Sequence, residues 1–298
     1  MSPKGGLDVK KRILFIGTGG TIASEMSDEG LLPGVGASAL LGYVPDVAQL
    51  CDVDSVQLYE LDSTNIGPEE WLGLASTIRN NYTRFDGFVI SHGTDTMAYT
   101  AAALSYLVQL SPKPIVLTGA QKPIGFDTTD SRQNLRDAFA VACDVGMHGV
   151  CIVFNGRVIL GTRARKTHSK SFDAFSSINY PNIADLRDGR LSRYIEPECL
   201  PEPRFYSELD TRVGLLKLIP GTEPELLDYM LSRCRALVIE SFGVGGLPER
   251  GGMHAAVKAA ARSGKAIVMT TQVQNEGSDL AVYSTGSALA KSPGILEA

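Results

Sequence analysis

The chain has 298 residues, of which 44% are apolar, and a formal net charge of −5 at pH 7. This length accommodates one large α/β domain or two domains, with enough apolar residues for a real core. The mildly acidic charge balance offers nothing that would recruit nucleic acid, so the expected partner is a small molecule. Residues 1–12 lack the apolar segment of a secretory signal, and no apolar run reaches transmembrane length.

The spacing of the cysteines and histidines argues against a disulfide-bonded protein and against a metal-binding one. The cysteines are odd in number, widely spaced and without a CxxC pair, which indicates reduced thiols in a cytoplasmic protein. The histidines show no metal-ligand spacing, so we expect no metal site. The cysteines are Cys51, Cys143, Cys151, Cys199 and Cys234.

Apolar runs alternate with helical patterns over the first half of the chain. The runs are almost continuously apolar, as strands buried on both faces of a sheet are. This alternation predicts an α/β fold with right-handed crossovers. The predicted strands are residues 13–16, 56–61, 88–90, 115–117 and 150–154, and the predicted helices are residues 68–82, 95–110 and 131–146.

A proline-rich, charged segment without periodicity covers residues 192–211 and indicates an interdomain linker. The α/β pattern then resumes, with strands at 213–219, 236–241 and 266–270 and helices at 223–233 and 253–262. We therefore predict a larger N-terminal parallel-sheet α/β domain over residues 1–191. A smaller C-terminal α/β domain is expected over residues 212–298.

Two loops that contain threonine follow predicted strands, and their sequences are GTGGTIA at 17–23 and SHGTDT at 91–96. In a parallel sheet both lie at the carboxyl edge, where open α/β sheets bind ligands. Thr21 is then either a nucleophile that needs activation, or a residue that caps a helix or binds a phosphate. Thr94 and Asp95 either bind an ammonium group and orient a reacting group, or have a structural role in which the Asp95 side chain caps the following helix.

Two further segments carry candidate polar groups. Lys166 lies in the basic stretch RARKTH, which is either a solvated surface or the source of a base held near Thr94 and Asp95. Asp62 and Ser63 follow the second predicted strand and form either a capping loop, which the residues alone favour, or part of a polar substrate site. The sequence does not show whether Lys166 approaches the threonine loops.

Together these segments resemble the bacterial-type L-asparaginases, and most closely their cytosolic type I branch. Several independent motifs agree in order and context, which makes the resemblance specific. It implies a larger N-terminal and a smaller C-terminal domain, and hydrolysis of L-asparagine to aspartate and ammonia without metal or organic cofactor. It also implies weak glutaminase activity and a cytoplasmic homodimer or homotetramer. The matching segments are TGGTI at 18–22, HGTDTMAYT at 92–100, LTGAQ at 117–121, FDAF at 172–175 and SFGVG at 241–245.

The resemblance also implies a role for each site residue. Thr21 would attack the side-chain amide and form an acyl-enzyme, and Thr94, Asp95 and Lys166 would form a second catalytic group. Asp95 would also hold the α-ammonium, the loop at Asp62 would hold the α-carboxylate, and backbone N–H groups around Thr94 would form the oxyanion hole. The expected substrate-binding residues are Asp62, Ser63, Gly20, Gly93 and Ala120.

The chain departs from the family pattern at two places that affect catalysis and fold. Leu31 stands where many relatives carry a tyrosine that assists proton transfer, which leaves water, or Lys166 acting through Thr94, as the source of activation for Thr21. The chain ends at Ala298, where relatives usually continue with further helices, so it is either truncated or naturally short.

Two alternatives to asparaginase activity follow from these features. One is a catalytically silent sensor of small amides that retains the pocket, which the leucine and the early end would fit. The other is the amidohydrolase subunit of a tRNA-dependent amidotransferase. Such subunits usually carry an additional N-terminal domain, whereas only about ten residues precede the first predicted strand here.

Glu240 predicts altered regulation. Some bacterial type I enzymes bind asparagine at an allosteric site through an arginine at the position before the SxGVG segment, and this chain has a carboxylate there, which would repel the carboxylate of asparagine. We therefore expect a hyperbolic dependence of the initial rate on asparagine concentration. Steady-state kinetics test this, and a sigmoidal curve that asparagine itself activates would contradict it.

Overall fold

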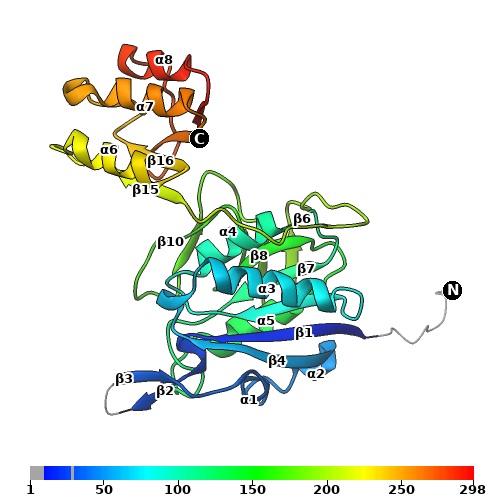
Figure 1. Cartoon of the computed structure of the whole chain (residues 1–298). Helices are drawn as coiled ribbons and strands as arrows, with labels where there is room; N and C mark the ends of the chain where they lie inside the picture. The colour runs from blue at the N-terminus through cyan, green and yellow to red at the C-terminus, as the bar shows by residue number, and fades with distance from the viewer. Residues whose placement is uncertain (1–9, 28–29) are drawn as a thin grey trace. The chain divides into compact units, whose positions relative to one another are not determined.

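The computed structural model describes residues 10–27 and 30–298, which fall into two compact units divided between Leu209 and Asp210 (Figure 1). The larger unit contains a mainly parallel sheet with helices on both faces, and the smaller unit contains a second parallel sheet with its own helices. The predicted fold class is therefore confirmed. Within the described residues, no helix combines the length and apolar character that crossing a bilayer requires.

The main sheet has eight strands in the order β13-β12-β9-β8-β7-β5-β1-β4. Its parallel part is formed by β1 (Lys11–Gly19), β4 (Cys51–Leu61), β5 (Gly87–Ser91), β7 (Pro114–Thr118) and β8 (Gly149–Phe154). An antiparallel extension continues it through β9 (Arg157–Leu160), β12 (Ala184–Arg187) and β13 (Arg190–Arg193). The central strands β5 and β7 are buried along their whole length, which explains their unbroken apolar sequences.

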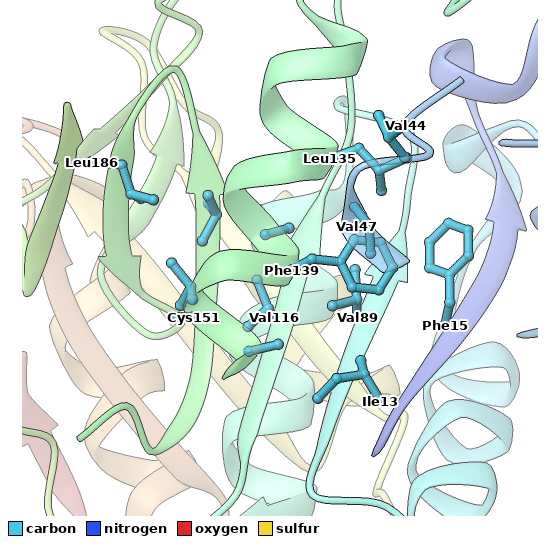
Figure 2. Packing of buried hydrophobic residues seen from close by; sticks show 14 of the residues in the cluster. Ile13, Phe15, Val44, Val47, Val89, Val116, Leu135, Phe139, Cys151 and Leu186 are labelled. Carbon is cyan, nitrogen blue, oxygen red and sulfur yellow. The ribbon is translucent and has the colours of Figure 1, made fainter. Parts of the chain in front are cut away.

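Side chains of β1 alternate between two hydrophobic cores, one on each face of the sheet. Ile13 and Phe15 face α5 (Ser131–Cys143), α1 (Ala37–Leu41) and α2 (Val47–Leu50). Figure 2 shows this cluster, in which the ring centroids of Phe15 and Phe139 lie 5.6 Å apart. Leu14 and Ile16 face the opposite core, with α3 (Pro68–Asn81) and α4 (Met97–Leu107).

Several elements of the first unit are absent from the sequence-based prediction. A hairpin of β2 (Ser24–Ser27) and β3 (Gly30–Pro33) follows the first threonine loop, and an antiparallel pair of β10 (Ala164–Lys166) and β11 (Phe175–Ser177) carries Lys166. Short 3₁₀ helices, η1 (Thr21–Ala23) and η2 (Ser63–Asn65), start where two of the sheet loops turn.

The residues that follow α4 form strand hydrogen bonds with the segment that the sequence predicts as a linker. Residues 108–110, predicted as helix, contain β6 (Val108–Gln109), which pairs with β14 (Arg204–Phe205). The Phe205 ring packs edge-on against Tyr82, with centroids 5.2 Å apart, and this contact ties the proline-rich segment to the first unit. Residues 192–209 therefore belong to the first unit in this structure.

The second unit contains a parallel sheet in the order β15-β16-β17-β18. Its strands are β15 (Val213–Lys217), β16 (Ala236–Ser241), β17 (Ala266–Thr271) and β18 (Ile295–Glu297), and its helices are α6 (Pro224–Arg233), η3 (Arg250–Gly252), α7 (Met253–Arg262) and α8 (Ser284–Ala290). Alternate residues of the central strands enter a separate apolar core with α6 and α7. Glu240 lies on β16, and its carboxylate pairs with Lys217 on β15 at 3.5 Å.

Candidate active site

Adjacent strands β1 and β5 end in the two threonine loops, which therefore meet at the carboxyl edge of the sheet. Gly20 has a φ of 80°, a conformation that L side chains rarely adopt, and a Cβ at this position would overlap the backbone of Gly93. The Thr18 hydroxyl donates a 2.8 Å hydrogen bond to the Ser91 carbonyl and joins the two loops at their base. The glycine contact places half-buried Thr21 at the junction of the loops.

A third loop packs against Gly93 from the other side. A Cβ on Gly93 would lie 2.6 Å from the side chain of Ser63, so this glycine is enclosed between Gly20 and Ser63. The Thr96 hydroxyl donates a 2.6 Å hydrogen bond to the Ser63 carbonyl and holds the two loops in register. Ser63 is only 3% exposed, and its hydroxyl makes no hydrogen bond within the described part of the chain.

Asp62 fills the capping role that its residue type alone favoured. Its Oδ1 accepts hydrogen bonds from the Thr64 backbone N–H at 2.8 Å and from the Thr64 hydroxyl at 2.7 Å. These bonds stabilise the charged carboxylate and lower the pKa of Asp62 below its usual value. Asp62 thereby fixes the first turn of η2 and the position of Ser63.

Lys166 reaches the second threonine loop from a distant part of the chain. Its Nζ donates hydrogen bonds to Thr94 Oγ1 at 2.8 Å and to Asp95 Oδ1 at 2.6 Å. The lysine side chain is 17% exposed and the Asp95 side chain 59%, so the ion pair lies at the border of the protein, and the lysine bonds to Oδ1 of Asp95. The structure thus brings Thr94, Asp95 and Lys166 together.

Gln121 completes this polar group, although the sequence analysis did not single it out as a site residue. Its Nε2 donates to the Ser171 carbonyl at 3.0 Å, which turns Oε1 toward the Thr94 hydroxyl at 3.2 Å. The Thr94 oxygen therefore accepts from Lys166, and its proton points to Gln121. The position of Gln121 directly after Ala120 in the LTGAQ motif was the available signal.

Hydrogen bonds from α5 and from the residue before it fix the loop that carries Ala120 and Gln121. Asp130, which precedes the helix, accepts hydrogen bonds from the backbone N–H groups of Gln121 and Lys122 at 3.0–3.2 Å. Buried Asn134 donates to the Gly119 carbonyl at 3.0 Å and accepts from the Asn155 backbone N–H at 2.9 Å. Ala120 is fully buried in this loop.

The FDAF motif anchors the segment opposite Lys166. Asp173 forms a bidentate pair with Arg157 at 2.7 and 3.2 Å, and Phe175 packs on Phe154 with ring centroids 5.0 Å apart. Phe175 is also the register partner of Lys166 in the β10–β11 pair. Paired charges and buried aromatic surface therefore fix the strand that presents the lysine.

A buried chain of hydrogen bonds runs behind the second threonine loop. The His92 Nδ1 lies 2.8 Å from the Gly93 carbonyl, which can only accept, so this nitrogen carries the proton. Nε2 then accepts from the Thr100 hydroxyl at 2.9 Å, and Thr100 in turn accepts from Trp71 Nε1 at 3.0 Å. His92 therefore fixes the loop as a neutral side chain.

Leu31 belongs to β3 and pairs through its backbone with Met26 of β2. The side chain of Leu31 lies outside the described part of the structure. The hairpin is tied to the first threonine loop because the backbone N–H groups of Gly34 and Val35 both donate to the Ala23 carbonyl at 2.9 Å.

Two family models match the chain: residues 12–198 match "Asparaginase, N-terminal" and residues 212–298 match "Glutaminase/Asparaginase C-terminal domain". An L-asparaginase from Thermococcus kodakarensis is 37% identical over 92% of this chain and 84% of its own. L-asparaginase 1 from Escherichia coli K12 is 32% identical over 94% of this chain and 85% of its own. The solved structure of the thermostable Thermococcus kodakarensis enzyme superposes with a TM-score of 0.87, covering 95% of this chain and 87% of that one.

A relative with another function is also similar. A glutamyl-tRNA(Gln) amidotransferase subunit from Methanopyrus kandleri is 35% identical over 93% of this chain, but the match covers only 65% of that relative. The two L-asparaginases are matched over a larger part of their own length, 84% and 85%.

The neutral state of His92 predicts a pH dependence of stability. Burial lowers its pKa from 6.5 to about 4, so the unfolded chain binds a proton that the folded chain excludes between these values. The free energy of unfolding should therefore fall by about 1.4 kcal/mol per pH unit from this group as the pH drops from about 6.5 to 4. NMR titration of the imidazole, assigned with His92→Gln, checks the value, and a midpoint near 6.5 would refute it.

Proposed function

Because the chain belongs to the asparaginase family, we propose that it is an L-asparaginase that hydrolyses L-asparagine to aspartate and ammonia. The single observation that carries the proposal is the hydrogen-bonded group of Lys166, Thr94 and Asp95 beside the loop of Thr21. Lys166 bonds to both Asp95 and the Thr94 hydroxyl at the edge of the sheet. The second threonine, Thr21, lies on the adjacent glycine turn. Weak glutaminase activity is part of the proposal.

We assign Thr21 as the nucleophile that forms an acyl-enzyme. The Thr21 oxygen attacks the side-chain amide carbon and forms a C–O bond. The C–N bond breaks, and the proton of the Thr21 hydroxyl passes to the nitrogen, which leaves as ammonia. Water then attacks the ester, and aspartate is released with the threonine restored. Within the described residues no hydrogen bond ties down the Thr21 hydroxyl, which leaves it available to a substrate.

The second group has a separate task in this proposal. Lys166 donates to both Asp95 and Thr94, and this pair of hydrogen bonds fixes the oxygen of Thr94. Thr94 is thereby oriented to direct water at the ester, and the backbone N–H groups around it stabilise the developing oxyanion. An enzyme that holds these groups in place before the substrate arrives needs little reorganisation during the reaction.

The substrate contacts follow from which polar atoms remain unused. Oδ1 of Asp95 pairs with Lys166, the side chain as a whole is 59% exposed, and we assign Oδ2 to the α-ammonium of the substrate. Within the part of the chain that the structure describes, the Ser63 hydroxyl makes no hydrogen bond, and we assign it to the α-carboxylate, with Asp62 fixing the loop. The glycines Gly20 and Gly93 allow the backbone to approach the substrate. Ala120, expected as a substrate-binding residue, is fully buried, so in this proposal it shapes the loop that carries Gln121.

A cytoplasmic location and a homodimer or homotetramer complete the proposal. All five cysteines are free thiols in the structure, which is typical of a reducing compartment. The oligomeric state follows only from the family resemblance.

The first test is ammonia release from L-asparagine by the purified protein without tRNA. We expect turnover in the wild type and a fall in kcat of roughly 10³-fold or more in both Thr21→Ala and Thr94→Val. Thr162→Val is a matched control, because Thr162 is exposed and belongs to the turn between β9 and β10 rather than to either threonine loop. A folded wild type without turnover would favour the amide sensor, and full activity in Thr21→Ala would reject the nucleophile.

The role of the lysine predicts a second kinetic result. Lys166→Met removes both hydrogen bonds, and we expect kcat to fall at least 100-fold, with partial activity in Lys166→Arg. Rapid quenching followed by mass spectrometry should then reveal an aspartyl group on the peptide that contains Thr21, since hydrolysis of the ester is slowed. The exposed Lys170→Met is the control, and unchanged kcat in Lys166→Met would contradict the assignment.

A further inference from the structure

A cavity of about 890 Å³ lies along α5, where it is bordered by α2 and by the turns that follow β8 and β12. Its lining includes Gln133, Arg136, Asp137 and Ala140, whose spacing places them on one face of α5. The volume is typical of a small-molecule site, since such sites enclose roughly 300–1,000 Å³. Among the described residues, none that we assign to the catalytic group lines this cavity.

The charged side chains that line the cavity are mostly acidic. Arg136 of α5 forms a 2.8 Å ion pair with Asp46, which precedes α2, so the charge of this arginine is already matched. The remaining carboxyl groups leave an excess of negative charge in the lining, which favours a cationic ligand. The charged lining residues are Asp46, Asp130, Arg136, Asp137 and Asp188.

Asp137 stands out because it is almost buried and has no cationic partner. The residue is only 4% exposed, and its Oδ1 accepts a 2.8 Å hydrogen bond from Gln133 Nε2. Within the described residues its Oδ2 makes neither a hydrogen bond nor an ion pair. Burial raises the pKa of Asp137 to about 6, against the hydrogen bond from Gln133 and the charge of Arg136.

The state of Asp137 indicates what the cavity lacks. A carboxylate that is removed from water costs free energy unless donors or a cation compensate it. Here one oxygen has a neutral donor and the other has none in the described part of the chain. A cation that entered the cavity and donated to Oδ2 would supply both the charge and the missing hydrogen bond.

The rest of the lining favours an organic cation over a metal ion. In residues 10–27 and 30–298, no three or more His, Cys, Asp or Glu side chains are grouped to hold a metal. Leu50 and Phe172 add apolar surface, which a hydrocarbon chain can cover. Lys122 Nζ lies 5.7 Å from the centre of the Phe172 ring, and within the described residues it makes no ion pair with a carboxylate of the lining.

We propose that this cavity is a second ligand site, which binds a primary ammonium or a guanidinium with a short hydrocarbon chain through Asp137. The cationic N–H groups donate to Oδ2 of Asp137, and the hydrocarbon chain packs on Leu50 and Phe172. The site does not depend on the proposed asparaginase reaction. It shares Asp130 and Asn134 with the support of the Gln121 loop, so its occupant lies against groups that fix that loop.

Calorimetric titration of the whole protein with n-butylammonium chloride at about pH 7.5, where Asp137 is ionised, tests the proposal. We expect one saturable site per chain with a Kd of about 1 mM, and no binding of the neutral probe n-butanol. Asp95→Asn should bind the ammonium as the wild type does. Loss of binding in Asp95→Asn would place the probe in the candidate active site and overturn the proposal.

Variants of the cavity identify the carboxylate that binds the probe. Asp137→Asn preserves the size of the side chain and an acceptor for Gln133 but removes the charge, and we expect at least tenfold weaker binding. Asp228→Asn, which changes an exposed carboxyl group on α6, is the matched control and should bind normally.

A second variant keeps the test decisive if Asp137→Asn does not fold. Ala140→Leu narrows the cavity from a partly exposed position of α5 and should also weaken binding at least tenfold. Equal affinity of the wild type and the folded cavity variant would show that the probe binds elsewhere. That result, or a wild type that does not saturate at tens of millimolar probe, would contradict the site.

Discussion

The contact between Gly20 and Gly93 is the constraint on which the site depends. Neighbouring parallel strands bring their loops to one edge of the sheet, but side chains normally keep such loops apart. Here a Cβ on either glycine would overlap the neighbouring loop, and Gly20 also needs a positive φ. The absence of two side chains therefore lets the loops of Thr21, Ser63 and Thr94 pack together at the carboxyl edge of the sheet.

The geometry around this contact is set by buried polar groups rather than by apolar packing. Two of these groups have partners of fixed chemical type: neutral His92 donates to the Gly93 carbonyl, and Asn134 binds both the Gly119 carbonyl and the Asn155 N–H. A buried polar atom that loses its partner costs more than an apolar contact of the same size, so such networks permit few alternatives. The loops can consequently be short and yet rigid.

Much of the fold could be predicted from the sequence, because strands buried on both faces leave continuous apolar runs, as in β5 and β8. The positions of Thr21 and Thr94 after such runs also located the edge of the sheet that carries the candidate site. The approach of Lys166 could not be predicted from local pattern. Its strand is three residues long, polar, and held by a pairing with β11 and by the Arg157–Asp173 ion pair, which only the folded chain reveals.

The same limit explains the missed elements near the linker. Residues 108–110 continue a helical pattern, but Val108 leaves the helical conformation and Leu110 adopts a φ of 54°. The reason is that this segment pairs with β14, which lies almost 100 residues further along the chain. A distant pairing partner overrides local propensity here. Gln121 was missed for a different reason, since its amide is oriented by the backbone carbonyl of Ser171, 50 residues away, and sequence patterns do not indicate such a contact.

The separate anchoring of Lys166 also bears on how the molecule fails under heat. Its two-stranded support lies outside the eight-stranded sheet and is only three residues long on each strand. Such small units open locally at a lower free-energy cost than a central sheet, whose strands are buried on both faces. Because Phe175 of β11 is buried against Phe154, detachment of the lysine on warming would also expose that ring, so loss of activity and loosening of this part of the core would occur together.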